Sequence, residues 1–159
     1  MRPDVTIRSA VPNDAAPAAA VIHAAFRQSN ARDYAPTIIE RLVAAFTPER
    51  VAQLIAQGGT LVAIADNALV GTASLVGSTV QSVFVDPRRQ GTGIGAALMR
   101  RLEAMAGSRR VERLSLQSSL TAAGFYRRLG YAMTGERDHE GERAMAMEKM
   151  LARSACRAQ

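Results

Sequence analysis

Residues 83 to 105 decide the fold of this 159-residue chain, and they read V-F-V-D-P-R-R-Q-G-T-G-I-G-A-A-L-M-R-R-L-E-A-M. Val83–Val85 is a β-branched and aromatic run, which predicts a buried strand, and Pro87 ends it because proline cannot donate a hydrogen bond to a neighbouring strand. Residues 91–95 hold three glycines. From Ile94 on, apolar residues recur at the spacing of an α-helix. The stretch therefore predicts a strand, a glycine-rich turn and a helix.

The glycine-rich turn at the start of this helix has the properties of a phosphate-binding site. The first backbone N–H groups of a helix have no partner within the helix, and the helix dipole adds partial positive charge there. Glycines let the backbone curl tightly and let a ligand approach without interference from Cβ atoms. Together these features predict that the turn binds a phosphate group.

Two common phosphate-binding motifs do not explain this turn. The loop that contains Gly-Lys-Ser/Thr is excluded because the only lysine of the chain is Lys149. The dinucleotide-binding fingerprint fits the spacing of Gly91, Gly93 and Ala96, but its first glycine should follow the strand directly, and five residues separate Val85 from Gly91. About sixty residues follow the turn, which is too few for the second half of such a fold.

The segment V-x-P-x-x-Q-G-x-G-I-G, from Val85 to Gly95, resembles motif A of the GNAT superfamily of N-acetyltransferases. The core of that motif falls on Gln90, Gly93 and Gly95, and a register that starts two residues earlier also fits. In that superfamily the backbone amides of the turn hold the pyrophosphate of coenzyme A. The resemblance therefore implies a coenzyme A site at this turn.

A second segment, S-S-L-T-A-A-G-F-Y-R-R-L-G-Y from Ser118 to Tyr131, resembles motif B of the same superfamily. Ser119 stands where that motif commonly has asparagine. The match makes Tyr126 the tyrosine that in many relatives lies near the sulfur of coenzyme A, so the resemblance implies that Tyr126 is catalytic. The cofactor-binding residues implied by the two motifs are Val83, Phe84, Val85, Arg88, Arg89, Gln90, Gly91, Thr92, Gly93, Ile94, Gly95, Ala96 and Ser119.

The resemblance also implies a reaction. An amine attacks the thioester of acetyl-CoA, and a backbone N–H at Phe84 or Val85 stabilises the oxyanion that forms. Tyr126 then protonates the leaving thiolate at modest cost, because a free thiol has a pKa of about 8.5 and a tyrosine one of about 10. The general base stays open between a water chain and a carboxylate such as Asp33 or Glu40. No metal is expected.

The histidines and the single cysteine are expected to stay outside the chemistry. His23 lies beside the apolar face of the first predicted helix and is expected to pack there, whereas His139 falls in a polar loop and is expected to be solvated. Cys156 lies in a predicted tail, which argues against an acetyl-cysteine intermediate. One cysteine cannot form an intrachain disulfide, so a reducing cytoplasmic location is expected.

The remaining sequence predicts an α/β protein with one domain over residues 1–152 and a flexible tail over residues 153–159. Short turns at Asp66-Asn67 and Gly77-Ser78 join three consecutive strands. The order of elements agrees with the GNAT fold, a mixed sheet flanked by helices. The predicted strands are 5–8, 60–65, 68–76, 79–85, 111–116, 131–134 and 143–150, and the predicted helices run from a cap at Asn13 or Asp14 to Gln28 and over 36–46, 47–55, 94–105 and 119–129.

Composition and charge narrow the partners. Hydrophobic residues make up 48% and charged residues 21% of the chain, which is ordinary for a globular protein. No stretch of about 18 or more apolar residues predicts a membrane span, and no signal peptide is recognised at the N-terminus. Nine arginines and only two acidic residues lie in residues 88–128. Because no nucleic-acid-binding motif accompanies them, an anionic cofactor explains this charge better than a nucleic acid.

The acceptor is the least determined part of the prediction. Tyr34 is the candidate acceptor contact, and its surroundings, S-x-A-x-x-Y-A-P-x-x-I, resemble a branch of small bacterial acetyltransferases with varied acceptors. We expect an enzyme that transfers an acetyl group from acetyl-CoA to a small-molecule or protein amine, as a monomer or homodimer, with no nucleic-acid or membrane partner. The alternative is a non-catalytic module that senses acyl-CoA.

Overall fold

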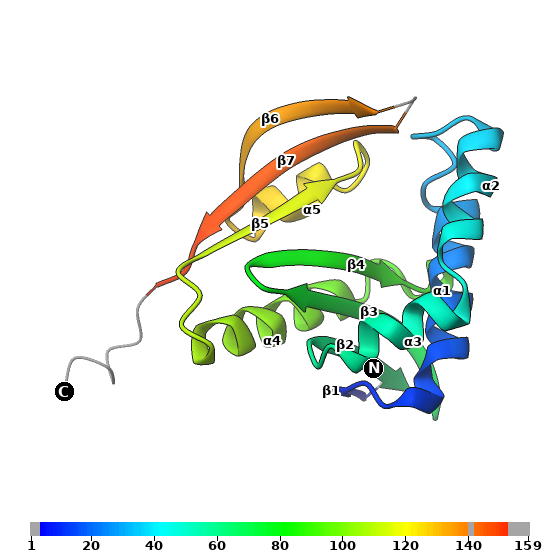
Figure 1. Cartoon of the computed structure of the whole chain (residues 1–159), viewed down its shortest axis with the longest axis horizontal. Helices are drawn as coiled ribbons and strands as arrows, with labels where there is room; N and C mark the ends of the chain where they lie inside the picture. Colours follow the sequence, from blue (N-terminus) through cyan, green and yellow to red (C-terminus); the bar gives the residue numbers. More distant parts are fainter. Residues whose placement is uncertain (1–3, 140–141, 153–159) are drawn as a thin grey trace.

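The computed structural model describes residues 4–139 and 142–152, and within them the backbone forms seven strands and five α-helices (Figure 1). The strands are β1 (Val5–Ser9), β2 (Thr60–Ala65), β3 (Ala68–Val76), β4 (Thr79–Val85), β5 (Arg113–Ser118), β6 (Ala132–His139) and β7 (Glu142–Met150). The helices are α1 (Ala15–Gln28), α2 (Pro36–Ala45), α3 (Pro48–Ala56), α4 (Ile94–Ser108) and α5 (Ala123–Arg128). The predicted tail, with Cys156, lies outside the described residues.

The strands form one mixed sheet in the order β1-β2-β3-β4-β5-β7-β6. The first four strands are antiparallel neighbours, β5 runs parallel to β4, and β7 runs antiparallel to both β5 and β6. Asp66 and Asn67 join β2 to β3 with φ angles of 52° and 61°, as a two-residue hairpin turn of this type requires. The predicted α/β fold, a mixed sheet flanked by helices, is confirmed.

The strands β4 and β5 are neighbours at one end only. Their register records a single pair, Thr79 with Ser115, next to a hydrogen bond of 3.0 Å from the Ser115 N–H to the Ser78 carbonyl oxygen. Further along, the two strands diverge (Figure 1). Ser82 contributes to the divergence, because it has a φ of 55° where the register between β3 and β4 shifts, and a bulge of this kind bends a strand. Among the described residues, the second half of β4 therefore has no neighbouring strand on this side.

Apolar side chains cover both faces of the sheet. The helices α1, α2 and α3 lie on one face and α4 on the other (Figure 1). The alternation along β4 shows the two faces directly. Phe84 packs against Phe26 and Phe46, with ring centroids 5.0 and 6.0 Å apart, whereas Val83 and Val85 pack on the side of α4. Burial on both faces explains why β2 and β3 are almost continuously apolar.

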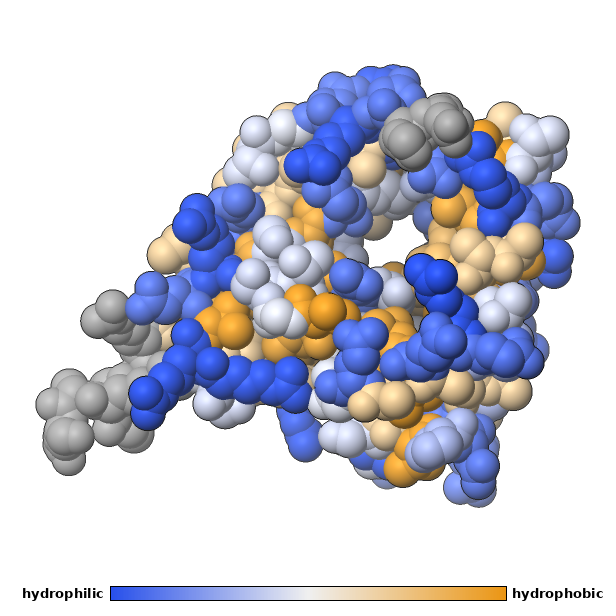
Figure 2. Space-filling view, in the orientation of Figure 1, coloured by the Kyte–Doolittle hydropathy of each residue, from blue (hydrophilic) through white to orange (hydrophobic). Residues whose placement is uncertain are grey.

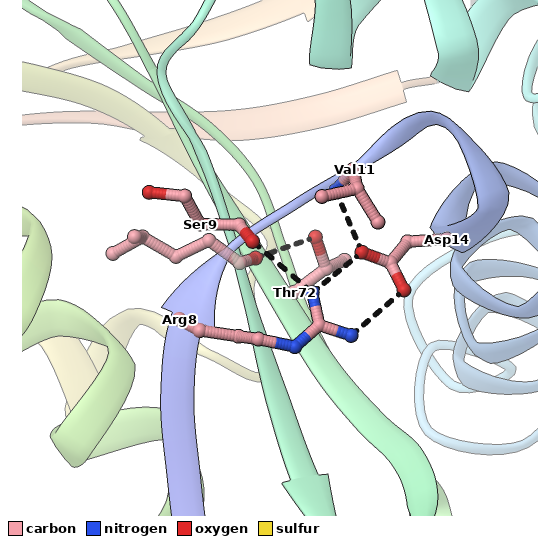
Figure 3. Close-up of polar contacts among 6 residues, drawn as sticks. Arg8, Ser9, Val11, Asp14 and Thr72 are labelled. Carbon is pink, nitrogen blue, oxygen red and sulfur yellow. Dashed lines mark hydrogen bonds and ion pairs between the residues drawn. The ribbon is translucent and has the colours of Figure 1, made fainter.

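Helix α1 begins directly after Asp14, one of the two predicted N-cap residues, but the Asp14 side chain forms no capping hydrogen bond with α1. Its carboxylate accepts hydrogen bonds from the Val11 N–H at 2.7 Å and from the Arg8 guanidinium at 2.8 and 3.0 Å (Figure 3). The hydrogen bonds from Arg8 lower the pKa of Asp14 below its usual range. Because these partners occupy both carboxylate oxygens, residues 12–14 form a 3-10 turn that precedes the helix.

Two strand boundaries also differ from the prediction. The strand predicted over 111–116 is β5, which covers Arg113–Ser118, because Arg110 closes a turn after α4 with a φ of 63°. The strand predicted to end at residue 134 is β6, which continues to His139 because it pairs with β7. Pairing of this kind is a tertiary interaction, and local sequence signals it poorly.

The helix predicted over residues 119–129 is shorter in the structure. The Ser119 hydroxyl oxygen accepts a hydrogen bond of 3.2 Å from the Ala122 N–H, so it caps a turn over residues 119–122, and the helix begins only at Ala123. Gly130 follows the helix with a φ of 99°, as predicted for the residue that ends it.

Candidate active site

A cavity of about 520 Å³ lies where β4 and β5 diverge. Its walls come from β4, from the glycine-rich turn, from the turn before α5 and from the end of α1. In the space-filling view an opening passes into the molecule between β4, α1 and the end of β5 (Figure 2). The predicted site residues on the cavity wall are Val83, Phe84, Val85, Arg89, Gln90, Gly91, Gly93, Ile94, Gly95, Ala96, Ser119 and Tyr126.

The glycine-rich turn presents backbone N–H groups to the cavity. Gly91 and Gly93 have φ angles of 78° and 88°, which other residues adopt only with strain. A Cβ atom at either position would meet no atom within 4 Å. Glycine is therefore favoured by the positive backbone angle, and crowding within the protein plays no part. The first intrahelical bond of α4 runs from the Ala97 N–H to the Gly93 carbonyl oxygen. The N–H groups of the first turn therefore have no partner within the helix, and such groups are suited to bind an anion.

Gly95 is favoured for a different reason. A Cβ atom at this position would lie 3.2 Å from the Phe125 ring, and the backbone there is helical. Gly95 therefore lets α4 approach α5, whose Phe125 and Tyr126 line the same cavity.

Backbone groups of β4 line the opposite wall. The Asp86 N–H donates to the Val70 carbonyl oxygen of β3 at 2.8 Å. Because successive N–H groups along a strand point to opposite sides, the N–H of Phe84 also points towards β3, and those of Val83 and Val85 point towards the gap. Of the two predicted oxyanion donors, the geometry therefore favours Val85 over Phe84, and it adds Val83.

Tyr126 lies on the cavity wall with its ring almost completely buried, at 7% exposure. Among the residues that the structure describes, none forms a hydrogen bond with its hydroxyl group. Burial raises the pKa of Tyr126 well above its usual value of about 10. Proton donation to an ordinary thiolate would then cost more than the sequence predicts. Burial of the thiol in the same cavity would raise its pKa too and reduce this difference.

The arginines near the cavity differ from the predicted set. The Arg88 guanidinium donates to Asp86 at 3.0 Å and borders a separate hollow of about 840 Å³ along α1, so the cavity does not support its predicted role. Arg89 lines the cavity and is paired with Asp66 at 3.1 Å. Arg128, which the motif comparison does not single out, also lines the cavity. No partner for its guanidinium lies among the described residues. The only feature of the sequence that could have indicated a role for Arg128 is its position in a basic segment, two residues after Tyr126.

Thr92 and Tyr34 lie away from the cavity wall. The Thr92 hydroxyl donates to the Arg89 carbonyl oxygen at 2.5 Å and so braces the turn from within. Tyr34 packs against the apolar cluster of α1, α2 and α3. Burial, with Asp33 and Glu142 nearby, raises the pKa of Tyr34. The structure therefore does not bring these two predicted site residues together with the others.

The loop after α1 contributes residues that sequence reasoning missed. Ser29 and Asn30 line the cavity, and so does Thr121 from the turn before α5. The Gln90 amide donates to the Ser29 hydroxyl oxygen at 2.7 Å. These contacts join segments that are far apart in the chain, so no local pattern could have indicated them.

The candidate general bases are engaged elsewhere. Asp33 accepts hydrogen bonds from Thr121, and Glu40 forms an exposed ion pair with Arg27 at 3.4 Å. His23 packs on α1 as expected, with its Nε2 atom 2.7 Å from the Phe46 carbonyl oxygen. His139 is the last residue of β6 and does not lie in a loop, contrary to the expectation, because β6 pairs with β7 as far as this residue. The expected solvation of its side chain lies outside what the structure describes.

Two negative findings apply to residues 4–139 and 142–152. No three side chains of histidine, cysteine, aspartate or glutamate gather there as candidate metal ligands. No helix there has the length and apolar character needed to cross a membrane.

The chain resembles known acetyltransferases in both sequence and structure. A family model described as "Acetyltransferase (GNAT) domain" matches residues 30–151. A segment of 69 residues is 39% identical to serotonin N-acetyltransferase 2, chloroplastic, of Oryza sativa subsp. japonica, and it covers 43% of this chain and 32% of that protein.

Solved structures extend the resemblance to the whole fold. A GCN5-related N-acetyltransferase from Rhodopseudomonas palustris is 30% identical with a TM-score of 0.84, over 95% of this chain and 97% of that one. The PaiA N-acetyltransferase of Thermoplasma acidophilum, solved in complex with coenzyme A, has the same fold at 19% identity and a TM-score of 0.78, over 92% and 99% of the two chains. The protein therefore belongs to the GNAT superfamily of acetyltransferases.

Proposed function

We propose that the protein transfers an acetyl group from acetyl-CoA to a primary amine by direct attack. The observation that carries this proposal is the cavity between β4 and β5, which is lined by both the glycine-rich turn and Tyr126. In coenzyme A the pantetheine arm joins the pyrophosphate to the thiol, so this part of the molecule matches a cavity with an anion-binding turn and Tyr126 on its wall. The complex of the Thermoplasma relative with coenzyme A supports the same ligand.

Each part of the cavity has a role in binding acetyl-CoA. The backbone N–H groups of the turn from Gly91 to Ala96 donate hydrogen bonds to the pyrophosphate, and Arg89 and Arg128 add positive charge. The open edge of β4 offers the backbone groups of Val83 and Val85 to the amides of the pantetheine arm, as an added strand would use them. Tyr126 then faces the sulfur.

The reaction follows from these positions. The amine nitrogen attacks the thioester carbon, and the N–H group of either Val83 or Val85, whichever does not pair with the pantetheine arm, stabilises the negative charge on the carbonyl oxygen. The carbon–sulfur bond then breaks, the sulfur takes the proton of the Tyr126 hydroxyl, and the new amide nitrogen loses a proton to water. Solvent returns a proton to Tyr126. Because Asp33 and Glu40 are engaged elsewhere, water carries the proton away from the amine.

The acceptor is a small-molecule or protein amine. Because Tyr34 does not line the cavity wall, it is proposed to contact a part of the acceptor that extends outside the cavity. Asp33 and Glu142 near Tyr34 favour a cationic group, which an amine is before it loses its proton.

The test is release of free thiol from acetyl-CoA across a panel of primary amines. We expect release that depends on both the amine and the protein. A protein that binds acetyl-CoA but releases no thiol with any amine would support the sensor alternative instead.

A second measurement tests the ligand. Acetyl-CoA should raise the melting temperature, because a ligand that binds only the native state stabilises it by mass action. NADH is the control and should change little. Stabilisation by NADH and not by acetyl-CoA would favour a dinucleotide site.

A further inference from the structure

The loop over residues 29–35, which joins α1 to α2, contacts both sides of the cavity mouth. Near its start, the Ser29 hydroxyl oxygen accepts a hydrogen bond from Gln90, in the turn before α4. Near its end, Asp33 accepts hydrogen bonds from Thr121, in the turn before α5. The loop therefore spans from the phosphate-binding turn to the end of β5.

The contact between Asp33 and Thr121 is well formed for two residues that lie 88 positions apart in the chain. The Thr121 hydroxyl donates to Asp33 Oδ1 at 2.6 Å, and the Thr121 N–H lies 3.2 and 3.4 Å from the two carboxylate oxygens. Three residues held by this arrangement, Ser29, Asn30 and Thr121, line the cavity. In Figure 1 the loop at the end of α1 and the end of β5 approach each other above β4.

We propose that Asp33 is a positioning residue, which holds the loop 29–35 across the gap between β4 and β5 through Thr121. This inference rests on the proposed acetyl transfer. The contact completes the wall of the cavity on the side opposite the phosphate-binding turn. Loss of the contact releases the part of the loop after Asn30, because Ser29 and Asn30 are also held by their N–H bonds to the Ala25 carbonyl oxygen. Tyr126 and the backbone of β4 stay in place because the core holds them.

The contact also determines the class of acceptor. With the loop tied to the turn before α5, an amine reaches the thioester through an opening bordered by packed segments and not across an open surface (Figure 2). A slender amine, such as a small molecule, fits this approach. A lysine on a folded protein surface does not, because its surroundings would meet the loop.

Steady-state kinetics of four variants tests the proposal. In Asp33→Ala we expect the KM for the amine and for acetyl-CoA to rise by about 3- to 10-fold, the range for one or two exposed hydrogen bonds, while kcat changes less than about 2-fold. Asp33→Asn keeps an acceptor oxygen and should recover most of the loss. Thr121→Val should reproduce part of it. Glu49→Ala, at an exposed position in α3 outside the contact, is the matched control and should leave both KM values unchanged.

A double-mutant cycle and an acceptor comparison sharpen the test. If Asp33 acts through Thr121, the double variant Asp33→Ala/Thr121→Val should be no worse than Asp33→Ala alone. The ratio of activity on a folded lysine-rich protein to activity on a small amine should rise in Asp33→Ala. Additive effects of the two substitutions, or an unchanged ratio, would overturn the proposal.

Hydrogen exchange separates failure of this inference from failure of the proposed function. The backbone amides of residues 29–35 should exchange faster in Asp33→Ala than in the wild type, whether or not the protein acetylates any amine. Unchanged exchange would overturn the contact as a restraint on the loop. If the amides exchange faster in Asp33→Ala but the wild-type protein transfers no acetyl group, the restraint on the loop is retained and only the proposed chemistry is rejected.

Discussion

Tyr126 and Tyr131 are neighbours in the core, yet their hydroxyl groups have opposite surroundings. Their ring centroids lie 5.9 Å apart. The Tyr131 hydroxyl donates to Glu103 at 2.9 Å, and the same carboxylate accepts a hydrogen bond of 2.9 Å from Lys149. Lys149 also donates to the Leu129 carbonyl oxygen at 2.7 Å. The Tyr126 hydroxyl has no such partner among the described residues and lies on a cavity wall.

The difference separates a polar group that stabilises the fold from one that serves a ligand. Among the described residues no buried side-chain nitrogen or oxygen atom lacks a hydrogen-bond partner. The Tyr126 hydroxyl has no such partner in this part of the chain, so this atom is reached from the cavity although the ring is buried. Around Tyr131 the hydrogen bonds connect α4, the end of α5 and β7 into a saturated cluster. Around Tyr126 none of the described residues forms a hydrogen bond with the hydroxyl, so this group remains available to a molecule bound in the cavity.

The largest expected effect is that of Tyr126→Phe on turnover. The ring and its packing remain, but the proton donor to the thiolate is lost, and general-acid catalysis contributes typically about 10²–10⁴-fold. We expect kcat to fall in this range, or by about 10-fold if water replaces the hydroxyl, with little change in acetyl-CoA affinity. The melting temperature should hardly change, because the hydroxyl has no partner in the free protein. Wild-type kcat, measured where chemistry limits turnover, would remove Tyr126 from the mechanism.

Tyr131→Phe should show the reverse pattern. It removes a partly buried hydrogen bond to a charged group, and such bonds contribute about 1.5–3 kcal/mol. We therefore expect the free energy of unfolding, measured by denaturant titration, to fall by about this amount, while kcat stays within about 2-fold of the wild type. A large loss of kcat with unchanged stability would show that the two tyrosines do not divide their roles in this way.

A glycine pair extends the same comparison to the backbone. Gly93→Ala and Gly77→Ala each place a Cβ atom in open space at a positive φ, 88° and 62° respectively, so each should cost about 1–2 kcal/mol of stability. Only Gly93 lies on the cavity. Calorimetry should therefore show weaker coenzyme A binding, by about 5- to 10-fold, for Gly93→Ala alone. Equal affinities of the two variants would mean that the turn before α4 does not bind the pyrophosphate.

The smallest expected effect concerns pH. Burial raises the pKa of Tyr126 above the usual value of about 10, so loss of its proton moves to higher pH. Tyr126 then stays protonated throughout the range from about pH 7 to 10. Over this range the pH dependence of kcat should therefore have the same shape in the wild type and in Tyr126→Phe. A fall below pH 10 that is present in the wild type and absent in the variant would show that the bound site lowers this pKa again.

Much of the fold followed from local signals. The strand before the turn, the three glycines and the helix after them are as predicted, because backbone angles and apolar periodicity are local properties. The turn at Asp66-Asn67 between two strands was also predicted correctly from its local sequence. The helix that carries Tyr126 was predicted four residues too early, since Ser119 caps a turn and not the helix.

The candidate site could be predicted only in part. The two motifs located the turn and Tyr126, and both line one cavity. The predicted role of Arg88 finds no support in the cavity, because Asp86, two residues before it, holds its guanidinium. Arg128 lines the cavity without having been singled out, because the side of α5 that faces the gap depends on how α5 packs.

The sequence by itself determined the elements, their order and the resemblance to one superfamily, since each rests on residues that are close together in the chain. The tertiary structure decided the divergence of β4 from β5, the contact of Asp33 with Thr121 and the absence of a partner for the Tyr126 hydroxyl among the described residues. These features depend on segments that meet across 30 to 90 residues. The conformational preferences of single residues do not specify contacts between such distant segments, because the free energy that fixes these contacts comes from packing of the whole core.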